Sequence, residues 1–138
     1  MGEKITERLS DAELDIMRTL WSAGLPLKAS EIVRLLSGKY SWKTPTAHVI
    51  LNRLCDKGYV NADRSGYSHK FYPVITEEAY FASQSTRLVR RTGRSIRDMV
   101  ASLIDTDEIT DDDIIALSDM LDKKRTEIEN RKQGGENG

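Results

Sequence analysis

Apolar residues in the first third of the chain recur every three or four positions, and turn residues separate the stretches that follow this spacing. The pattern predicts three helices, over residues 11–22, 31–36 and 45–57. A capping box that starts at Ser10 precedes the first helix, and Gly58 follows the third as a typical C-terminal stop. The chain therefore opens with three short helices joined by tight connections.

The third helix has two chemically different faces. Thr44 is expected as its N-cap and Pro45 as its first residue, where a missing amide costs nothing. The apolar positions, expected to face a core, are Ala47, Ile50, Leu51 and Leu54. The positions expected to face elsewhere are Thr46, His48, Val49, Asn52, Arg53 and Asp56. The outer face thus offers hydrogen-bonding groups and one apolar side chain for recognition.

Two stretches of alternating polarity, residues 59–64 and 69–74, surround a connector with a glycine and predict a β-hairpin. Pro73 is expected at a sheet edge or at the end of the ladder, and residues 25–27 are expected to be extended, with a short strand as the alternative. The order helix, helix, helix, hairpin is that of a winged helix-turn-helix, whose third helix enters the DNA major groove. We therefore expect a mainly α fold with a small β-hairpin wing, the winged helix-turn-helix domain spanning residues 1–75.

From Thr76 onward only helical spacing remains. Further helices are expected from Thr76, after Ser95 and after Thr110, giving a three-helix domain over 76–130 and a disordered tail over 131–138. These helices have too little core to be stable alone, so their apolar stripes are expected to bury against a second copy in a dimerisation domain. The residues assigned to this dimer interface are Ile96, Met99, Val100, Leu103, Ile104, Ile114, Leu117 and Leu121.

Charged residues are distributed unevenly along the chain, and this changes what its net charge indicates about partners. The chain has 138 residues, enough for one domain and a small appendage, and its net charge of −1 argues weakly against a nucleic-acid partner. Residues 1–75, however, carry 11 basic and 8 acidic side chains, whereas residues 101–138 carry 5 basic and 11 acidic ones. This asymmetry suggests two parts with different partners; the alternative is that the charges only solvate exposed helix faces.

The composition also excludes several classes of protein. No apolar stretch approaches the ~18 residues of a membrane span and the N-terminus lacks a signal-peptide core, so a cytoplasmic protein without membrane insertion is expected. The lone Cys55 excludes an internal disulfide and is expected to be a small buried hydrophobe. Because no metal-ligand spacing, phosphate loop or nucleophile motif occurs, no metal site, cofactor or enzymatic activity is expected. A metal sensor built from Asp and Glu of the last third is the alternative.

DNA contacts are assigned from the chemistry of the exposed positions. Hydroxyl, amide and imidazole groups hydrogen-bond to base edges, and an apolar side chain can meet a thymine methyl. The base-reading residues are therefore expected to be Thr46, His48, Val49 and Asn52. The phosphate contacts are expected from Trp42, Lys43, Arg53, Arg64 and His69. For Trp42, a role as a core plug at the start of the helix is an equal alternative.

Three stretches carry a resemblance to a known family. The runs LSDAELDIMRTLW, ASEI and WKTPTAHVILNRLCDKGYVNADRSGYSHKFYPVI resemble the BlaI/MecI penicillinase-repressor family, strongly over residues 9–75 and more weakly over 76–128. The copper-responsive CopY repressors share the N-terminal domain. The resemblance implies a homodimeric transcriptional repressor that occludes a promoter at a two-fold symmetric operator and is released by an inducing signal. By position, it implies base reading by Thr46, His48 and Val49.

The chain departs from the family pattern in three places. His48 stands where several relatives have arginine, so guanine recognition should be weaker. Ser102 and Leu103 occupy the place of the Asn–Phe bond that is cleaved in β-lactam-responsive members, which puts a partner membrane sensor-protease in doubt and leaves another inducer system open. No cysteine follows Cys55, which excludes copper sensing of the CopY type. Two other functions are kept: a winged-helix protein-interaction adaptor without DNA readout, and a repressor with a small-molecule pocket between its two domains.

Overall fold

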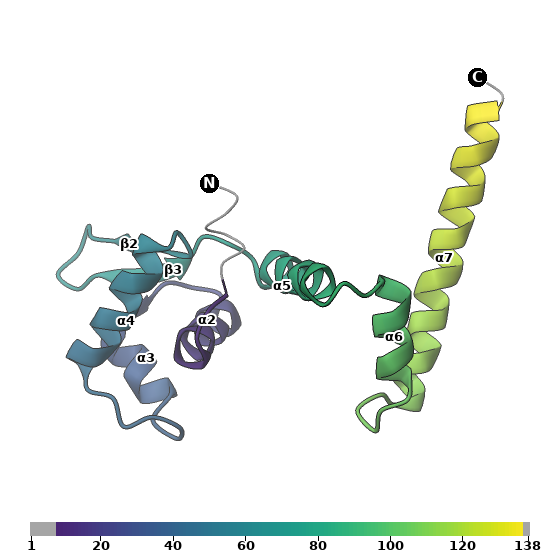
Figure 1. Ribbon diagram of the computed structural model, residues 1–138. Coiled ribbons are helices and arrows are strands. Elements are labelled where there is room, and N and C mark those ends of the chain that lie inside the picture. Colours follow the sequence, from purple (N-terminus) through teal and green to yellow (C-terminus); the bar gives the residue numbers. More distant parts are fainter. Residues whose placement is uncertain (1–7, 137–138) are drawn as a thin grey trace. The chain divides into compact units, whose positions relative to one another are not determined.

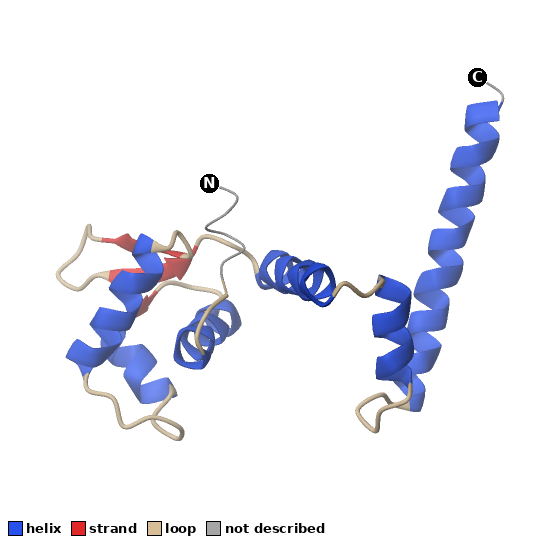
Figure 2. Ribbon diagram, in the orientation of Figure 1, coloured by secondary structure: helices blue, strands red, loops and turns tan. Residues whose placement is uncertain are grey.

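The computed structural model describes residues 8–136, and within this range the chain forms six helices and three short strands (Figures 1 and 2). The helices are α2 (Asp11–Ala23), α3 (Ala29–Leu35), α4 (Thr44–Asp56), α5 (Glu77–Thr92), α6 (Ile96–Ile104) and α7 (Asp111–Glu136). The strands are β1 (Leu27–Lys28), β2 (Val60–Asp63) and β3 (Lys70–Pro73). The order confirms the predicted mainly α fold with a winged helix-turn-helix at its N-terminal end. No described helix is long and apolar enough to cross a membrane.

The described chain divides into two compact units, one ending at Thr92 and one beginning at Gly93. This division differs from the predicted domain boundary at residue 75, because α5 belongs to the first unit. Tyr80 on α5 is buried, its hydroxyl accepts a hydrogen bond from the Leu9 amide at 3.2 Å, and its ring contacts the rings of Trp21 and Tyr59. The second unit consequently contains two helices, α6 and α7, where the sequence predicts three.

The first unit has one hydrophobic core, to which each of its helices contributes. The core residues are Leu9, Ile16, Met17, Leu20, Leu27, Ala29, Ile32, Ala47, Leu51, Leu54, Tyr59, Val60, Phe71, Ile75 and Tyr80. The predicted capping box is present, since the Ser10 hydroxyl accepts from the Glu13 amide and the Glu13 carboxylate accepts from the Ser10 amide. Gly24 ends α2 with φ of 68°, a left-handed conformation that glycine adopts at little cost.

The predicted hairpin forms and gains a third strand. The sheet order is β1-β3-β2 with antiparallel pairing throughout, so the second hairpin strand is the central strand. Phe71 pairs with Leu27 of β1 on one side and with Ala62 of β2 on the other. Pro73 pairs with Val60 at the end of the ladder, as predicted, because β1 does not extend that far and needs no amide from it.

Two helix starts differ by one or two residues from the predicted ones. Helix α3 begins at Ala29 rather than after Ser30, because the Glu31 carboxylate accepts the Lys28 amide at 2.9 Å and caps the earlier start. Helix α4 begins at Thr44, with Lys43 at the cap position. Pro45 is thus the second helical residue, where its missing amide is still harmless because first-turn amides have no partner within the helix. The predicted stop at Gly58 is confirmed by its φ of 85°.

In the second unit, both predicted caps form. The Ser95 hydroxyl accepts from the Asp98 amide at the start of α6, and Thr110 and Asp113 cap α7 reciprocally. The predicted disordered tail is wrong for residues 131–136, which continue α7, while residues 137–138 lie outside the described part. Adding a residue to an existing helix costs little, and a glycine costs only about 1 kcal/mol relative to alanine, so the Gly134–Gly135 pair does not stop it.

Candidate nucleic-acid interface

Helix α4 presents one face to the core and one to solvent. Ala47, Leu51 and Leu54 have no exposed surface, so the inner face is fixed by packing. On the outer face the structure brings together the predicted contact residues Thr46, Val49, Asn52 and Arg53, all of which are exposed. The Val49 side chain is 57% exposed. Single apolar side chains are common on protein surfaces, so a contact of Val49 with a thymine methyl stays a prediction.

His48 is the predicted base reader that the structure places differently. Its ring is half-buried and meets the ring of Phe71 on β3 edge-on, with centroids 5.8 Å apart at an angle of 67°. Around α4, position 48 lies between Leu51 on the buried side and Asn52 on the exposed side. The imidazole is therefore at the border of the outer face, oriented by Phe71, and its role in base reading stays a prediction.

The loop before α4 is held against α2. The Tyr40 hydroxyl donates to Asp15 Oδ2 at 2.5 Å, and Lys39 Nζ lies 2.9 Å from the same oxygen. Both contacts hold the pKa of Asp15 below its ordinary value, and the hydrogen bond to Asp15 raises the pKa of Tyr40. The contact between Asp15 and Tyr40 was not predicted from the sequence, because nothing local shows that residues 25 positions apart meet.

Trp42 continues this anchored loop toward the start of α4. Its ring stacks on Tyr40 with centroids 4.0 Å apart, and it packs against the hydrophobic core while partly exposed. This packing supports the core-plug alternative, and donation of its indole N–H to phosphate stays a prediction. Lys43 follows directly, exposed and at the cap position of α4, and its contact with phosphate stays a prediction.

Behind α4, a buried ion pair joins its C-terminal end to the start of α2. Lys57 Nζ lies 2.9 Å from Oε2 and 3.1 Å from Oε1 of Glu13, whose side chain is 3% exposed. Burial alone would raise the pKa of Glu13, but hydrogen bonds from the Ser10 amide and from Lys57 outweigh it and hold the pKa below its ordinary value. The capping box pointed to Glu13, but no signal in the sequence pointed to its partner Lys57.

The wing brings two predicted phosphate contacts together. Arg64 donates from Nη1 to Nδ1 of His69 at 3.0 Å across the hairpin, and both side chains are exposed. The Asp63 carboxylate accepts the amide and the hydroxyl of Ser65, which stiffens the turn. With Arg53 on α4, the first unit therefore presents cations at both the helix and the wing.

Comparisons with known proteins decide the family. The family model described as "Penicillinase repressor" matches residues 9–123, which is most of the chain. The chain belongs to the penicillinase repressor family. Membership makes it a winged-helix transcriptional repressor and not an enzyme.

Individual relatives cover most of this repressor. It is 28% identical over 127 residues to the penicillinase repressor of Bacillus licheniformis, covering 91% of this chain and 95% of that protein. It is 20% identical over 120 residues to the methicillin resistance regulatory protein MecI of Staphylococcus aureus (strain N315), covering 86% of this chain and 97% of that protein. The solution structure of the DNA-binding domain of the repressor BlaI matches with 32% identity and a TM-score of 0.46, over 53% of this chain and 88% of that one. The solution structure of monomeric Bacillus licheniformis BlaI in complex with the blaP half-operator matches with 31% identity and a TM-score of 0.46. The match covers 54% of this chain and 90% of that one.

The repressor has a single cysteine and no evident metal ligands in the part that the structure describes. Cys55 is half-buried beside the core, and burial raises the pKa of its thiol. Among residues 8–136, no three His, Cys, Asp or Glu side chains lie where they could hold a metal ion together. The acidic residues that begin α7 instead include the capping residue Asp113.

The residues assigned to a dimer interface lie on α6 and α7 of the repressor, and most are exposed in the single chain. Their exposed fractions are Ile96 70%, Val100 41%, Leu103 54%, Ile104 46%, Ile114 41%, Leu117 39% and Leu121 65%, with Met99 half-buried. Four of them line a hollow of about 420 Å³ between the two helices: Val100, Leu103, Ile104 and Leu117. The Ser102–Leu103 bond lies inside α6, where the Ser102 hydroxyl donates to the Met99 carbonyl at 2.7 Å.

Proposed function

We propose that this repressor binds operator DNA with the outer face of α4 and the wing, and blocks a promoter as a homodimer. The observation that carries the proposal is the exposed face of Thr46, Val49, Asn52 and Arg53 on a helix whose opposite side has no exposed surface. A rigid helix with a solvent-facing polar surface is what major-groove readout requires. The relative BlaI, solved in complex with the blaP half-operator, supports the same use of the domain.

In this proposal the contacts divide into two classes. Thr46, Val49 and Asn52 read base edges, with His48 at the border of the face. The residues that hold phosphates are Trp42, Lys43, Arg53, Arg64 and His69. Because few cations are involved, one head binds weakly, and useful affinity comes from linking two heads at high effective concentration.

The exposed apolar residues of α6 and α7 support the second half of the proposal. Each large aliphatic side chain that becomes buried contributes about 1.5–3 kcal/mol, and seven of the eight assigned residues are exposed in the single chain. A second copy covers them in a two-fold arrangement, because identical surfaces pair most simply about such an axis. The two heads of the dimer then face half-sites about one helical turn, or a multiple of it, apart.

The release signal in this proposal is not cleavage at an Asn–Phe bond. The corresponding place is a Ser102–Leu103 bond within α6, which lacks both residues of that pair. Thiolate chemistry of the CopY type is also absent, since no cysteine follows Cys55. A membrane sensor-protease is therefore a weaker expectation than another inducer system.

Selection of bound duplexes from a random pool, followed by sedimentation of the full chain with and without the enriched DNA, tests the proposal. The expected result is an inverted repeat bound by two copies. Val49→Glu should abolish the enrichment, because it places a negative charge on the outer face of α4, while Gln133→Glu on α7 should not. A chain that stays monomeric and enriches no sequence contradicts the proposal and favours the adaptor function.

A further inference from the structure

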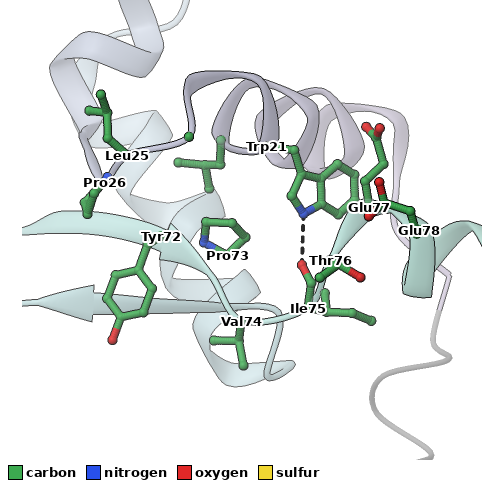
Figure 3. A pocket seen from close by; sticks show the side chains of 12 residues that line it. Trp21, Leu25, Pro26, Tyr72, Pro73, Val74, Ile75, Thr76, Glu77 and Glu78 are labelled. Carbon is green, nitrogen blue, oxygen red and sulfur yellow. Dashed lines mark hydrogen bonds between the residues drawn. The ribbon is translucent and has the colours of Figure 1, made fainter.

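A groove runs along the first unit, between the end of α2 and the segment that leads from β3 into α5. One wall comes from Trp21 and from Leu25 and Pro26 after α2, and the other from residues 72–78 (Figure 3). Its volume is about 640 Å³, and Leu25 and Val74 on opposite walls are 58% and 59% exposed. The groove lies within the first unit and uses none of the residues assigned to DNA or to the dimer interface.

The lining is apolar with a negative rim. Trp21, Leu25, Pro26 and the strand end at Pro73 supply the apolar surface. The indole N–H of Trp21 donates to the Ile75 carbonyl at 2.9 Å, as the dashed line in Figure 3 marks, so this donor is already used.

The lining of the groove contains no basic side chain, and its side-chain donors are the neutral hydroxyls of Tyr72 and Thr76 and the indole of Trp21. Pro26 and Pro73 have no amide, and no lysine, arginine or histidine lines the groove. The carboxylates of Glu77 and Glu78, both exposed, add negative charge at one end. A ligand with a large apolar body and a positive charge matches this lining, whereas an anion finds no cation to pair with.

We propose that this groove is a binding site for small hydrophobic organic cations. The apolar body lies between Leu25 and Val74, and the positive charge lies near Glu77 and Glu78 and over the Trp21 ring. Aromatic faces attract cations in addition to the Coulomb attraction of carboxylates. The proposal does not rest on the proposed DNA function, because its test measures ligand binding alone.

The position of the groove connects two parts of the first unit. Trp21 belongs to α2, which supports α4 through the core, while Glu77 begins the helix that Tyr80 anchors. A ligand in the groove contacts both segments and stabilises their packing. A bound cation should therefore raise the melting temperature of the chain, because binding to the native state alone stabilises it.

A second hollow, beside Phe81 and between α2 and α5, shares Trp21, Glu77 and Glu78 with the groove but is also lined by Arg18. The guanidinium of Arg18 opposes a cationic ligand there. The charge complementarity therefore favours the first groove. It also distinguishes a cation from a second copy of the chain, which would need an apolar partner surface rather than a positive one.

Calorimetric titration of the full chain with tetraphenylphosphonium tests the site, and tetraphenylborate is the matched probe of the same shape and opposite charge. The expected result is one phosphonium per chain, bound at least about tenfold more tightly than the borate. The double variant Glu77→Gln/Glu78→Gln keeps the shape of the rim and should weaken phosphonium binding about tenfold. The control pair Glu127→Gln/Glu129→Gln on α7 should leave it unchanged.

Leu25→Lys provides an independent variant, because the side chain is exposed and its replacement should not disturb the core. It should weaken phosphonium binding by about tenfold or more by placing a cation in the groove. Equal binding of the two probes, or phosphonium binding unaffected by Glu77→Gln/Glu78→Gln, overturns the proposal. So does a parent chain that binds no phosphonium, and dissociation of its dimer by Leu25→Lys would then assign the groove to a second copy.

Discussion

Lys57 Nζ and Glu13 Oε2 lie 2.9 Å apart at the C-terminal end of α4, although 44 positions separate the two residues in the chain. The carboxylate is 3% exposed and also accepts the Ser10 amide, so one side chain caps α2 and pairs with the residue after α4. A buried charge of this kind is tolerated because it is both paired and hydrogen-bonded. The pair therefore fixes the end of α4 relative to the start of α2.

Lys57→Met should lower the free energy of unfolding by about 2–3 kcal/mol, because it leaves the Glu13 carboxylate buried without its cation. Urea denaturation followed by circular dichroism measures the loss. The matched control is Lys124→Met, which removes an exposed pair with Glu127 at 3.4 Å and should cost less than about 0.5 kcal/mol. Equal losses of unfolding free energy in the two variants would show that the buried pair stabilises the fold no more than the exposed pair does.

The same pair should make stability depend on pH in the acid range. The pKa of Glu13 is lowered in the native state from its ordinary value of 4.5, so its contribution is fully present well above pH 4.5. The contribution should be lost as the pH falls through 4.5 and then through the lower native pKa. Unfolding free energies of the parent chain and of Glu13→Gln, measured between about pH 7 and 3, should converge as the pH falls. Curves that stay parallel would contradict the assignment.

Thr46→Ala should weaken binding to the selected operator by about 1–3 kcal/mol with little change for unrelated DNA, because a hydroxyl that reads a base contributes only at the right sequence. Fluorescence anisotropy at fixed salt measures both affinities. Thr126→Ala on α7, whose hydroxyl donates to the Asp122 carbonyl, is the control and should change neither. The same loss on both DNAs would remove Thr46 from the base-reading set.

Arg53→Ala should act mainly on the salt dependence of DNA binding. Each lost phosphate contact should reduce the slope of log K against log salt by about 0.9, because fewer counterions are released. Titrations at several salt concentrations give the slope, and Arg125→Ala on α7 is the control. An unchanged slope would show that Arg53 does not contact phosphate.

Leu103→Asp should dissociate the dimer. Leu103 is 54% exposed in the single chain, and placing a carboxylate in the proposed interface loses about 1.5–3 kcal/mol of burial and adds a desolvation cost. Sedimentation velocity should show a dimer constant weakened at least about tenfold. Leu35→Asp, at a residue of α3 that is 58% exposed, should leave it unchanged. A dimer that tolerates Leu103→Asp would place the interface elsewhere.

Local signals predicted most elements and the outer face of α4. The Ser10 capping box, Gly58 and the alternating stretches around Gly66 each act over a few residues, and the elements they predict are present. Where the structure differs from the prediction, the local signal in the sequence was too weak to end a helix or to set a domain boundary. The Gly134–Gly135 pair did not end α7, and a boundary at residue 75 gave way to the packing of Tyr80.

The sequence by itself determined the helices, the hairpin and the polar outer face of α4, because caps, turns and periodicity are read within one or two turns of chain. Only the tertiary structure decided which distant residues meet: Glu13 with Lys57, Asp15 with Tyr40, and the Leu9 amide with the hydroxyl of Tyr80. It also formed the groove beside Trp21 from segments about 50 positions apart. Such contacts depend on how whole elements pack, and neither charge nor spacing along the chain encodes a partner at that distance.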